Sequence, residues 1–152
     1  APLSPFNAWQ IIQGLETVGL RMKQHCSNAE KVVAFLETQK KVKNVIYPTN
    51  HQGEIKDRAL RYMKGGYGSL VGMDLGTIEN GAKFINNLKM FYHVANIGDA
   101  RSLAIHPAST THSQLPPKDQ LAAGVTPGYV RLSIGIEHPD DIIADIRQSL
   151  AA

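Results

Sequence analysis

Apolar residues recur at steps of three and four along the first quarter of the chain, and this repeat constrains the fold more than any other feature. Its members are Phe6, Trp9, Ile12, Leu15, Val18, Met22, Cys26, Ala29, Val33 and Leu36. Such spacing places side chains on one face of an α-helix. Ser4 followed by Pro5 is typical of a helix N-cap with proline at the first helical position. We therefore predict one long helix, bent near Gly14 or Gly19.

The predicted helix is long for a domain of this size. About 33 residues at 1.5 Å each give roughly 50 Å. A compact chain of 152 residues has a radius of gyration of only ~15 Å, so one end of the helix should project from the domain. The apolar repeat continues into that end at Phe6, Trp9 and Ile12. We expect this end to pack against something outside the present sequence.

The rest of the chain alternates between short strands and helices. We expect strands at residues 45–47, 69–75, 91–97 and 129–136, and helices at 55–63, 78–88, 119–123 and from His138 onwards. No internal repeat is visible in this order. The prediction is a single α+β domain over residues 1–152, with a small mostly antiparallel sheet and helices on one face.

Composition bounds the class of protein. The chain is 43% apolar and 19% charged, which is ordinary for a soluble globular domain. It has no run of ~18 apolar residues that could span a membrane, and its first ten residues lack the pattern of a signal peptide. The single cysteine, Cys26, cannot form an internal disulfide and is expected to be a buried small hydrophobe. We therefore expect a cytoplasmic protein with no membrane partner.

The distribution of charge gives no sign of a nucleic-acid partner. The net charge is only +3, and the basic residues are scattered except for Lys40, Lys41 and Lys43. These three follow the long helix, where cations complement the negative end of its dipole. No RNA-binding aromatic motif and no zinc-finger spacing accompanies them.

The tail of the chain carries the candidate site. Residues 96–115, NIGDARSLAIHPASTTHSQL, are polar and are predicted to form a long loop, and long ordered loops usually serve a site. In the strand that follows, alternation places Val130 and Leu132 on one face and Arg131 on the other. Pattern alone favours a solvated role for Arg131 and a turn role for Asn96. A guanidinium also suits a carboxylate, so a carboxylate clamp stays open as the alternative.

Three other motifs have ordinary structural interpretations. The GGYG run at 65–68 follows a helix and precedes a strand, the reverse of a phosphate-binding loop, so we expect a helix C-cap and turn. His106 and His112 lack the spacing of a metal site, and no metal ligand is predicted. Ser109 or Ser113 with His112 could form a nucleophile–base pair, which keeps an independent hydrolase as a weaker hypothesis.

The same segments carry a family resemblance that covers essentially the whole chain. NIGDARSLAIHPASTTHSQL, followed by AAGVTPGYVRLSIGIEHPDDIIADI, resembles the C-terminal portion of the Cys/Met-metabolism enzymes that use pyridoxal phosphate. SPFNAWQIIQGLETVGLRMKQHCSNAEKV is similar to the helix that opens that region. Within the family, the first segment most resembles the O-acetylhomoserine sulfhydrylases.

The resemblance implies roles for three residues. Arg131 of the RLS motif would bind the α-carboxylate of an amino-acid substrate, Asn96 would lie at the same pocket, and Thr111 would line it. The implied reaction is a γ-replacement, a transferase reaction of methionine biosynthesis and transsulfuration, in which O-acetylhomoserine and sulfide give homocysteine. Pyridoxal phosphate would serve as the electron sink.

The chain departs from the family pattern in one respect. The family's Schiff-base lysine, pyridinium aspartate, stacking tyrosine and phosphate loop belong to an upstream domain, and no segment here matches them. The resemblance therefore implies a C-terminal domain that has no catalytic residue of its own and is inactive alone. A missing N-terminal domain would bind most of the cofactor, and the full-length enzyme would be a homo-oligomer, a homotetramer. The competing hypothesis is a non-catalytic interaction module that binds through Phe6, Trp9 and Ile12.

Overall fold

A five-stranded sheet organises the fold. The structure is a computed structural model that describes residues 2–152. The strands lie in the order β1-β2-β5-β4-β3 and comprise β1 (Asn44–Ile46), β2 (Leu70–Asp74), β3 (Tyr92–His93), β4 (Leu103–Ile105) and β5 (Tyr129–Ser133). Neighbouring strands are antiparallel except β3 and β4, which are parallel. The predicted small, mostly antiparallel sheet is confirmed.

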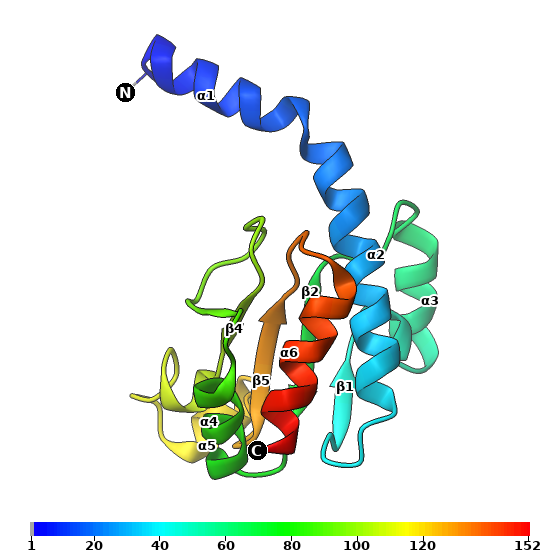
Figure 1. Ribbon diagram of the computed structural model, residues 1–152, viewed down its shortest axis with the longest axis vertical. Coiled ribbons are helices and arrows are strands. Elements are labelled where there is room, and N and C mark those ends of the chain that lie inside the picture. The colour runs from blue at the N-terminus through cyan, green and yellow to red at the C-terminus, as the bar shows by residue number, and fades with distance from the viewer. Residues whose placement is uncertain (1) are drawn as a thin grey trace.

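Three helices cover one face of this sheet (Figure 1). They are α2 (Val18–Glu37), α4 (Ile78–Asn87) and α6 (Pro139–Ala151). The connections contain α3 (Gly53–Tyr62), α5 (Pro117–Ala122) and the 3-10 turns η1 (Pro48–Asn50) and η2 (Pro107–Ser109). The α+β class is therefore confirmed, and the opposite face of the sheet is left to loops and short elements.

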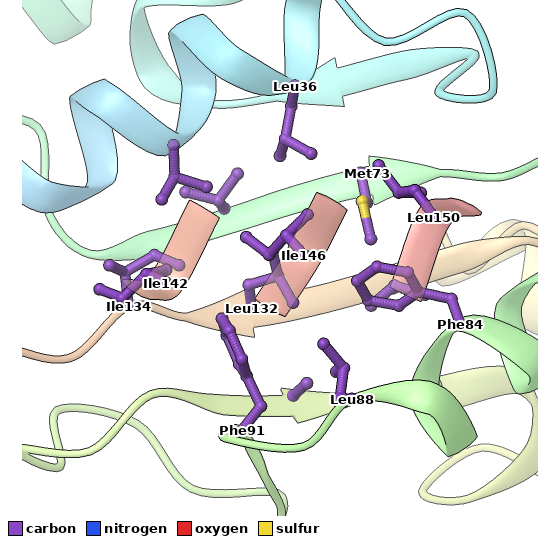
Figure 2. Close-up of a cluster of buried hydrophobic side chains, with 14 of the residues drawn as sticks. Leu36, Met73, Phe84, Leu88, Phe91, Leu132, Ile134, Ile142, Ile146 and Leu150 are labelled. Carbon is purple, nitrogen blue, oxygen red and sulfur yellow. The ribbon is translucent and has the colours of Figure 1, made fainter. Parts of the chain in front are cut away.

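The hydrophobic core lies between the sheet and the three helices (Figure 2). Alternation along β5 directs Val130 and Leu132 into it, and both side chains are fully buried. Ile142, Ile146 and Leu150 meet them from α6 at helical spacing. Burying one such side chain stabilises the fold by about 1.5–3 kcal/mol, so this layer fixes which face of β5 points away from the helices.

The N-terminal helical region is long, as predicted, and a break at Thr17 divides it into two helices. α1 (Pro5–Glu16) ends before Thr17, where φ is −107° and ψ is 2°. The break lies between the two glycines at which a bend is expected. Arg21 Nη2 donates to the Gly14 carbonyl at 2.6 Å and Arg21 Nε to Thr17 Oγ1 at 3.3 Å. The guanidinium thus satisfies a carbonyl near the C-terminal end of α1.

α1 projects from the domain, as its length predicts (Figure 1). None of its described residues is buried. The exposed fractions of Phe6, Trp9 and Ile12 are 63%, 55% and 54%. Apolar side chains of this size are rarely grouped on a surface that has no partner.

Strand β4 lies inside the segment 96–115, which is therefore not a continuous loop. Leu103, Ala104 and Ile105 are all buried, and they pair with β5 on one side and β3 on the other. Three apolar residues within a polar segment are too few to show a strand period. Two predicted strands are also too long: residues 91–97 contain only β3, and the strand predicted at 129–136 ends at Ser133.

The C-cap of α3 is Met63, so the glycine run at 65–68 lies in the connection between α3 and β2 and does not cap the helix as predicted. Gly66 and Gly68 have φ values of +129° and +85°, which side-chain-bearing residues rarely adopt. A Cβ at Gly66 would lie 2.7 Å from Cys26 Sγ, so glycine also allows close packing there. Cys26 is buried and unpaired, as predicted. Within residues 2–152, no helix combines the length and apolar character needed to cross a membrane.

Candidate functional site

Arg131 lies on the sheet face opposite the three covering helices. It is paired in register with Gly72 of β2 and Ile105 of β4, and Gly72 is paired in turn with Ile46 of β1. Residues paired in this way share one face of an antiparallel sheet. Arg131 therefore places a cation in an otherwise apolar row that crosses four strands.

Two pockets meet at Arg131 and Tyr129. The loop-side pocket, of about 420 Å³, is lined by residues that include Ala95, Ile105, Thr111, His112, Tyr129 and Arg131. The helix-side pocket, of about 320 Å³, lies toward α3 and is lined by residues that include Ile46, His51, Ile55, Gly72, Tyr129 and Arg131. Both volumes suit a small molecule rather than a macromolecule.

In the described part of the chain, the guanidinium of Arg131 has one hydrogen-bonding partner, and most of its donors are unused. Nη2 donates to the backbone carbonyl of Asn96 at 3.3 Å. Within residues 2–152, neither ion pair, Arg58–Glu54 or His138–Asp140, involves Arg131. A guanidinium carries five N–H donors. It can therefore bind an incoming carboxylate in the bidentate manner that such groups favour.

Tyr129 forms the wall between the two pockets, and Gly72 makes room for its ring. A Cβ at Gly72 would lie 2.7 Å from Tyr129 Cε2 and 3.0 Å from the phenolic oxygen. Burial raises the pKa of Tyr129, while the nearby charge of Arg131 acts in the opposite direction. The phenol is therefore neutral near pH 7 and is available to hydrogen bond beside the cation.

The structure brings Asn96, Thr111 and Arg131 into one region through different kinds of atoms. Asn96 contributes its main-chain carbonyl to Arg131, whereas its neighbour Ala95 lines the loop-side pocket. Thr111 lines the same pocket, and its Oγ1 lies 2.9 Å from His112 Nδ1. Asn96 therefore contacts the Arg131 guanidinium through its main-chain carbonyl, and this contact does not depend on the Asn96 side chain.

His106 is a structural residue in this fold. It is buried, its Nε2 lies 2.8 Å from the Pro127 carbonyl, and its Nδ1 lies 2.8 Å from Ser109 Oγ. Because a carbonyl can only accept, Nε2 carries a proton, and Nδ1 pairs with the Ser109 hydroxyl. Among residues 2–152 there is no group of three or more His, Cys, Asp or Glu side chains that could hold a metal ion.

The serine–histidine pairs of the hydrolase hypothesis are not formed. Ser109 is paired with His106, and Ser113 Oγ donates to the Thr110 carbonyl at 2.8 Å. The hydrogen-bonding partner of His112 Nδ1 is Thr111. This arrangement supports hydrogen bonding within an ordered segment rather than nucleophilic catalysis by these serines.

Gly72 and Ile46 belong to the site but were missed by sequence reasoning. Their place beside Arg131 depends on the register between strands, which the sequence does not display. One signal was present: Gly72 interrupts an apolar strand, and such a glycine often marks a close approach of another group.

Comparisons with known proteins agree on the type of chain. A family model described as Cys/Met metabolism PLP-dependent enzyme matches residues 1–151. The O-acetyl-L-homoserine sulfhydrylase of Leptospira meyeri is 51% identical over 97% of this chain. The L-methionine gamma-lyase of Fusobacterium nucleatum subsp. polymorphum is 42% identical over 99% of it. The chain spans only 34% and 38% of these two relatives, about a third of their length.

A solved structure shows the same fold. It is that of a protein from Campylobacter jejuni described as an O-acetylhomoserine (thiol)-lyase with N'-pyridoxyl-lysine-5'-monophosphate. The TM-score is 0.91 at 40% sequence identity, and the match covers 100% of this chain and 36% of that one. The fold described here is thus one part of a larger molecule in that structure.

The Arg131 site does not fit pyridoxal phosphate by itself. A protein that holds this cofactor supplies a lysine for its aldehyde carbon and a partner for its ring nitrogen, commonly a carboxylate. Neither pocket beside Arg131 is lined by a lysine, an aspartate or a glutamate. A group of lysines (Lys40, Lys41, Lys43 and Lys83) lines a different cavity, bordered by α4 and α6. The groups beside Arg131 instead fit the carboxylate end of a substrate.

Proposed function

This chain belongs to the Cys/Met-metabolism PLP-dependent enzymes, and from that premise we propose that it is the substrate-carboxylate domain of an O-acetylhomoserine sulfhydrylase. The full-length enzyme would be a transferase that makes homocysteine from O-acetylhomoserine and sulfide. The reaction would serve methionine biosynthesis in the cytoplasm.

The observation that carries this proposal is the state of Arg131. Among the described residues, this guanidinium has no ion pair, and it stands in an apolar row between two pockets of small-molecule size. An amino-acid substrate presents one carboxylate, and a planar guanidinium holds it in a fixed orientation. Asn96 and Thr111 would complete the pocket, the first through its carbonyl and the second through its side chain.

The proposal divides the work between two domains. When bound, pyridoxal phosphate supplies the electron sink of the reaction. Its lysine and most of its contacts would come from an N-terminal domain outside this chain. The present residues would hold the substrate by its carboxylate and narrow its possible orientations. This domain alone would therefore be inactive.

Helix α1 supports the idea that a further domain packs here. Its apolar side chains are exposed along its whole length, and the relatives are about three times as long as this chain. We assign this surface to the contact with the N-terminal domain. Association of full-length copies into a homotetramer is part of the same proposal.

A second function has support from the similarity to two L-methionine gamma-lyases. A lyase of that kind would use the same carboxylate site, because its substrate is also an amino acid. The two functions differ in whether sulfide replaces the leaving group. The carboxylate site itself cannot distinguish them.

The test is an assay of the full-length enzyme with two substrates. We expect sulfide-dependent formation of homocysteine from O-acetylhomoserine, little release of methanethiol from methionine, and no turnover by the 152-residue chain alone. Rapid release of methanethiol with no homocysteine formed would overturn the sulfhydrylase assignment in favour of the lyase.

A further inference from the structure

The carbonyl that contacts Arg131 belongs to an exposed loop. Residues 94–101, between β3 and β4, are all exposed to solvent. In Figure 1 this loop stands beside the β5–α6 connection, at the end of the sheet nearest α1. An exposed loop with few buried contacts is mobile unless hydrogen bonds hold it. The position of Asn96 relative to Arg131 therefore depends on what anchors the loop.

The main anchor is a pair of residues, Ser102 and Glu137. The Glu137 carboxylate accepts from the Ser102 backbone N–H at 2.6 Å and from the Ser102 hydroxyl at 2.9 Å. The Ser102 hydroxyl oxygen accepts in turn from the Gly135 N–H at 2.9 Å. Ser102 is fully buried and out of reach of water, so its polar groups depend on these hydrogen bonds, and losing one would leave a buried group unsatisfied.

Two further hydrogen bonds extend the anchor along the loop. The Ile136 N–H donates to the Ala100 carbonyl at 2.9 Å, and the Gly98 N–H donates to Ser133 Oγ at 3.2 Å. A Cβ at Gly135 would overlap both the Glu137 carboxylate and the Ala100 carbonyl. The loop is thus fastened to the residues that follow Arg131 in the chain.

Helix α2 fixes the other side of the anchor. Asn28 Nδ2 donates to the carbonyls of Gly135 and Glu137, at 3.0 and 2.8 Å. His25 Nδ1 lies 2.6 Å from the Ile134 carbonyl. Both α2 residues are buried, so the segment that carries Glu137 is attached to the rigid helical layer.

We propose that Ser102 and Glu137 are positioning residues for substrate binding. They hold the loop so that the Asn96 carbonyl fixes one edge of the Arg131 guanidinium and leaves its other donors facing the pockets. Neither residue lines the pockets beside Arg131, so both act through Asn96 and Arg131. The inference rests on the proposed function, because it concerns affinity for an amino-acid carboxylate.

The experiment compares variants of Ser102 and Glu137 in the full-length enzyme. Ser102→Ala and Glu137→Ala remove hydrogen bonds of the anchor. Glu137→Gln keeps the size of the side chain but replaces the charged carboxylate with an amide, which is a weaker acceptor. The matched control is Ser149→Ala, because Ser149 is also buried and donates to a carbonyl, that of Phe84, on the helical side. Two readouts are taken: steady-state kinetics with each substrate varied, and hydrogen–deuterium exchange of peptides that cover residues 96–101.

We expect Ser102→Ala and Glu137→Ala to raise KM for O-acetylhomoserine about tenfold, with kcat within about twofold and KM for sulfide unchanged. Glu137→Gln should give a smaller rise, and Ser149→Ala none. Exchange at residues 96–101 should accelerate only in the anchor variants. Sulfide carries no carboxylate, so a loss of carboxylate positioning leaves KM for sulfide unchanged. A general structural defect would instead change KM for both substrates.

The possible failures can be told apart. An active wild-type enzyme whose anchor variants keep the normal KM for O-acetylhomoserine overturns the positioning role and leaves the proposed function intact. A wild-type enzyme that makes no homocysteine overturns the proposed function. In that case unchanged exchange at residues 96–101 in Ser102→Ala would overturn the anchor as well, and accelerated exchange would support it.

Discussion

At the scale of single residues, the site depends on the setting of one arginine. Arg131 stands between Gly72 and Ile105 on the sheet and donates to a main-chain carbonyl. The side chains of Gly72 and Ile105 carry no hydrogen-bonding group, so these neighbours leave the other guanidinium donors open to a carboxylate. Within residues 2–152 no ion pair competes for this guanidinium, so the side chain would be able to act as the proposed carboxylate clamp.

The first prediction concerns Arg131→Lys in the full-length enzyme. Lysine keeps the charge but loses the bidentate fork, so substrate binding should weaken by about 1–3 kcal/mol, the scale of a charged hydrogen bond. The measurement is KM for the amino-acid substrate. The control is Arg147→Lys on α6, whose guanidinium stacks on Phe35 away from the site. Unchanged KM and kcat in Arg131→Lys would rule out the clamp.

The second prediction concerns alkaline pH and Tyr47. Burial is the largest cause that raises the pKa of the Tyr47 phenol, and its hydroxyl donates to the Gly68 carbonyl at 2.9 Å. The unfolded chain loses this proton near pH 10, but the folded chain retains it. The stabilising contribution is therefore complete below about pH 10 and is lost as the pH rises above it.

Thermal unfolding of wild type and Tyr47→Phe at pH 8 and pH 11 would measure this effect. Phenylalanine cannot ionise, so the variant should lose less stability between the two pH values, although it is less stable at pH 8 by about 1 kcal/mol for the missing hydrogen bond. Equal losses in both proteins would contradict the assignment to Tyr47.

At the scale of elements, helix α6 holds the end of α4 through one buried carboxylate. Asp145 accepts from the backbone N–H groups of Lys89, Met90 and Phe91, at distances of 2.9 to 3.3 Å. It also accepts from Gln148. These hydrogen bonds satisfy the backbone N–H groups of the segment between α4 and β3. One side chain of α6 therefore connects α6 to the end of α4 and to the start of the edge strand β3.

The third prediction is that Asp145→Ala lowers the free energy of unfolding by about 3 kcal/mol, because several N–H groups are left without an acceptor. Urea unfolding of the protein would measure the change. Asp141→Ala on the same helix is the matched control. Asp141 is exposed in the first turn, where an acidic side chain contributes only about 0.3–1 kcal/mol through the helix dipole. Equal effects of the two substitutions would contradict the bracing role of Asp145.

At the scale of the whole molecule, α1 is the part of the chain that this domain cannot bury. Its apolar side chains point to more than one side of the helix, including Ile11 and Ile12. The break at Thr17 sets its direction away from the sheet (Figure 1). A helix of 12 residues is marginal in water alone, so α1 requires a partner surface for its stability.

The fourth prediction is that the isolated chain self-associates through α1. Sedimentation should show association that rises with concentration and that Trp9→Glu reduces, because a charge replaces an exposed apolar side chain. Gln13→Glu is the control, since it adds the same charge to the same helix without removing apolar surface. A strictly monomeric wild-type chain at high concentration would contradict this prediction. In the full-length enzyme the N-terminal domain would occupy the surface instead.

The sequence by itself determined the features that are written in local periodicity. The apolar repeat identified the helical region and its projecting end, and alternation in β5 identified the outward face of Arg131. The Ser4 cap marked where the first helix begins. These signals need only neighbouring residues, because side chains three or four apart on a helix, or two apart on a strand, face the same way.

Only the tertiary structure decided the pairings between distant segments. Residues Leu103–Ile105 form a strand because they pair with β5 on one side and with β3 on the other. Gly72 came to lie opposite Arg131 through strand register. Asn96 meets Arg131, and Ser102 meets Glu137, across 35 residues of sequence in both cases. The surroundings of Arg131 are assembled from such contacts, and no local pattern records them because their energies depend on the whole chain having folded.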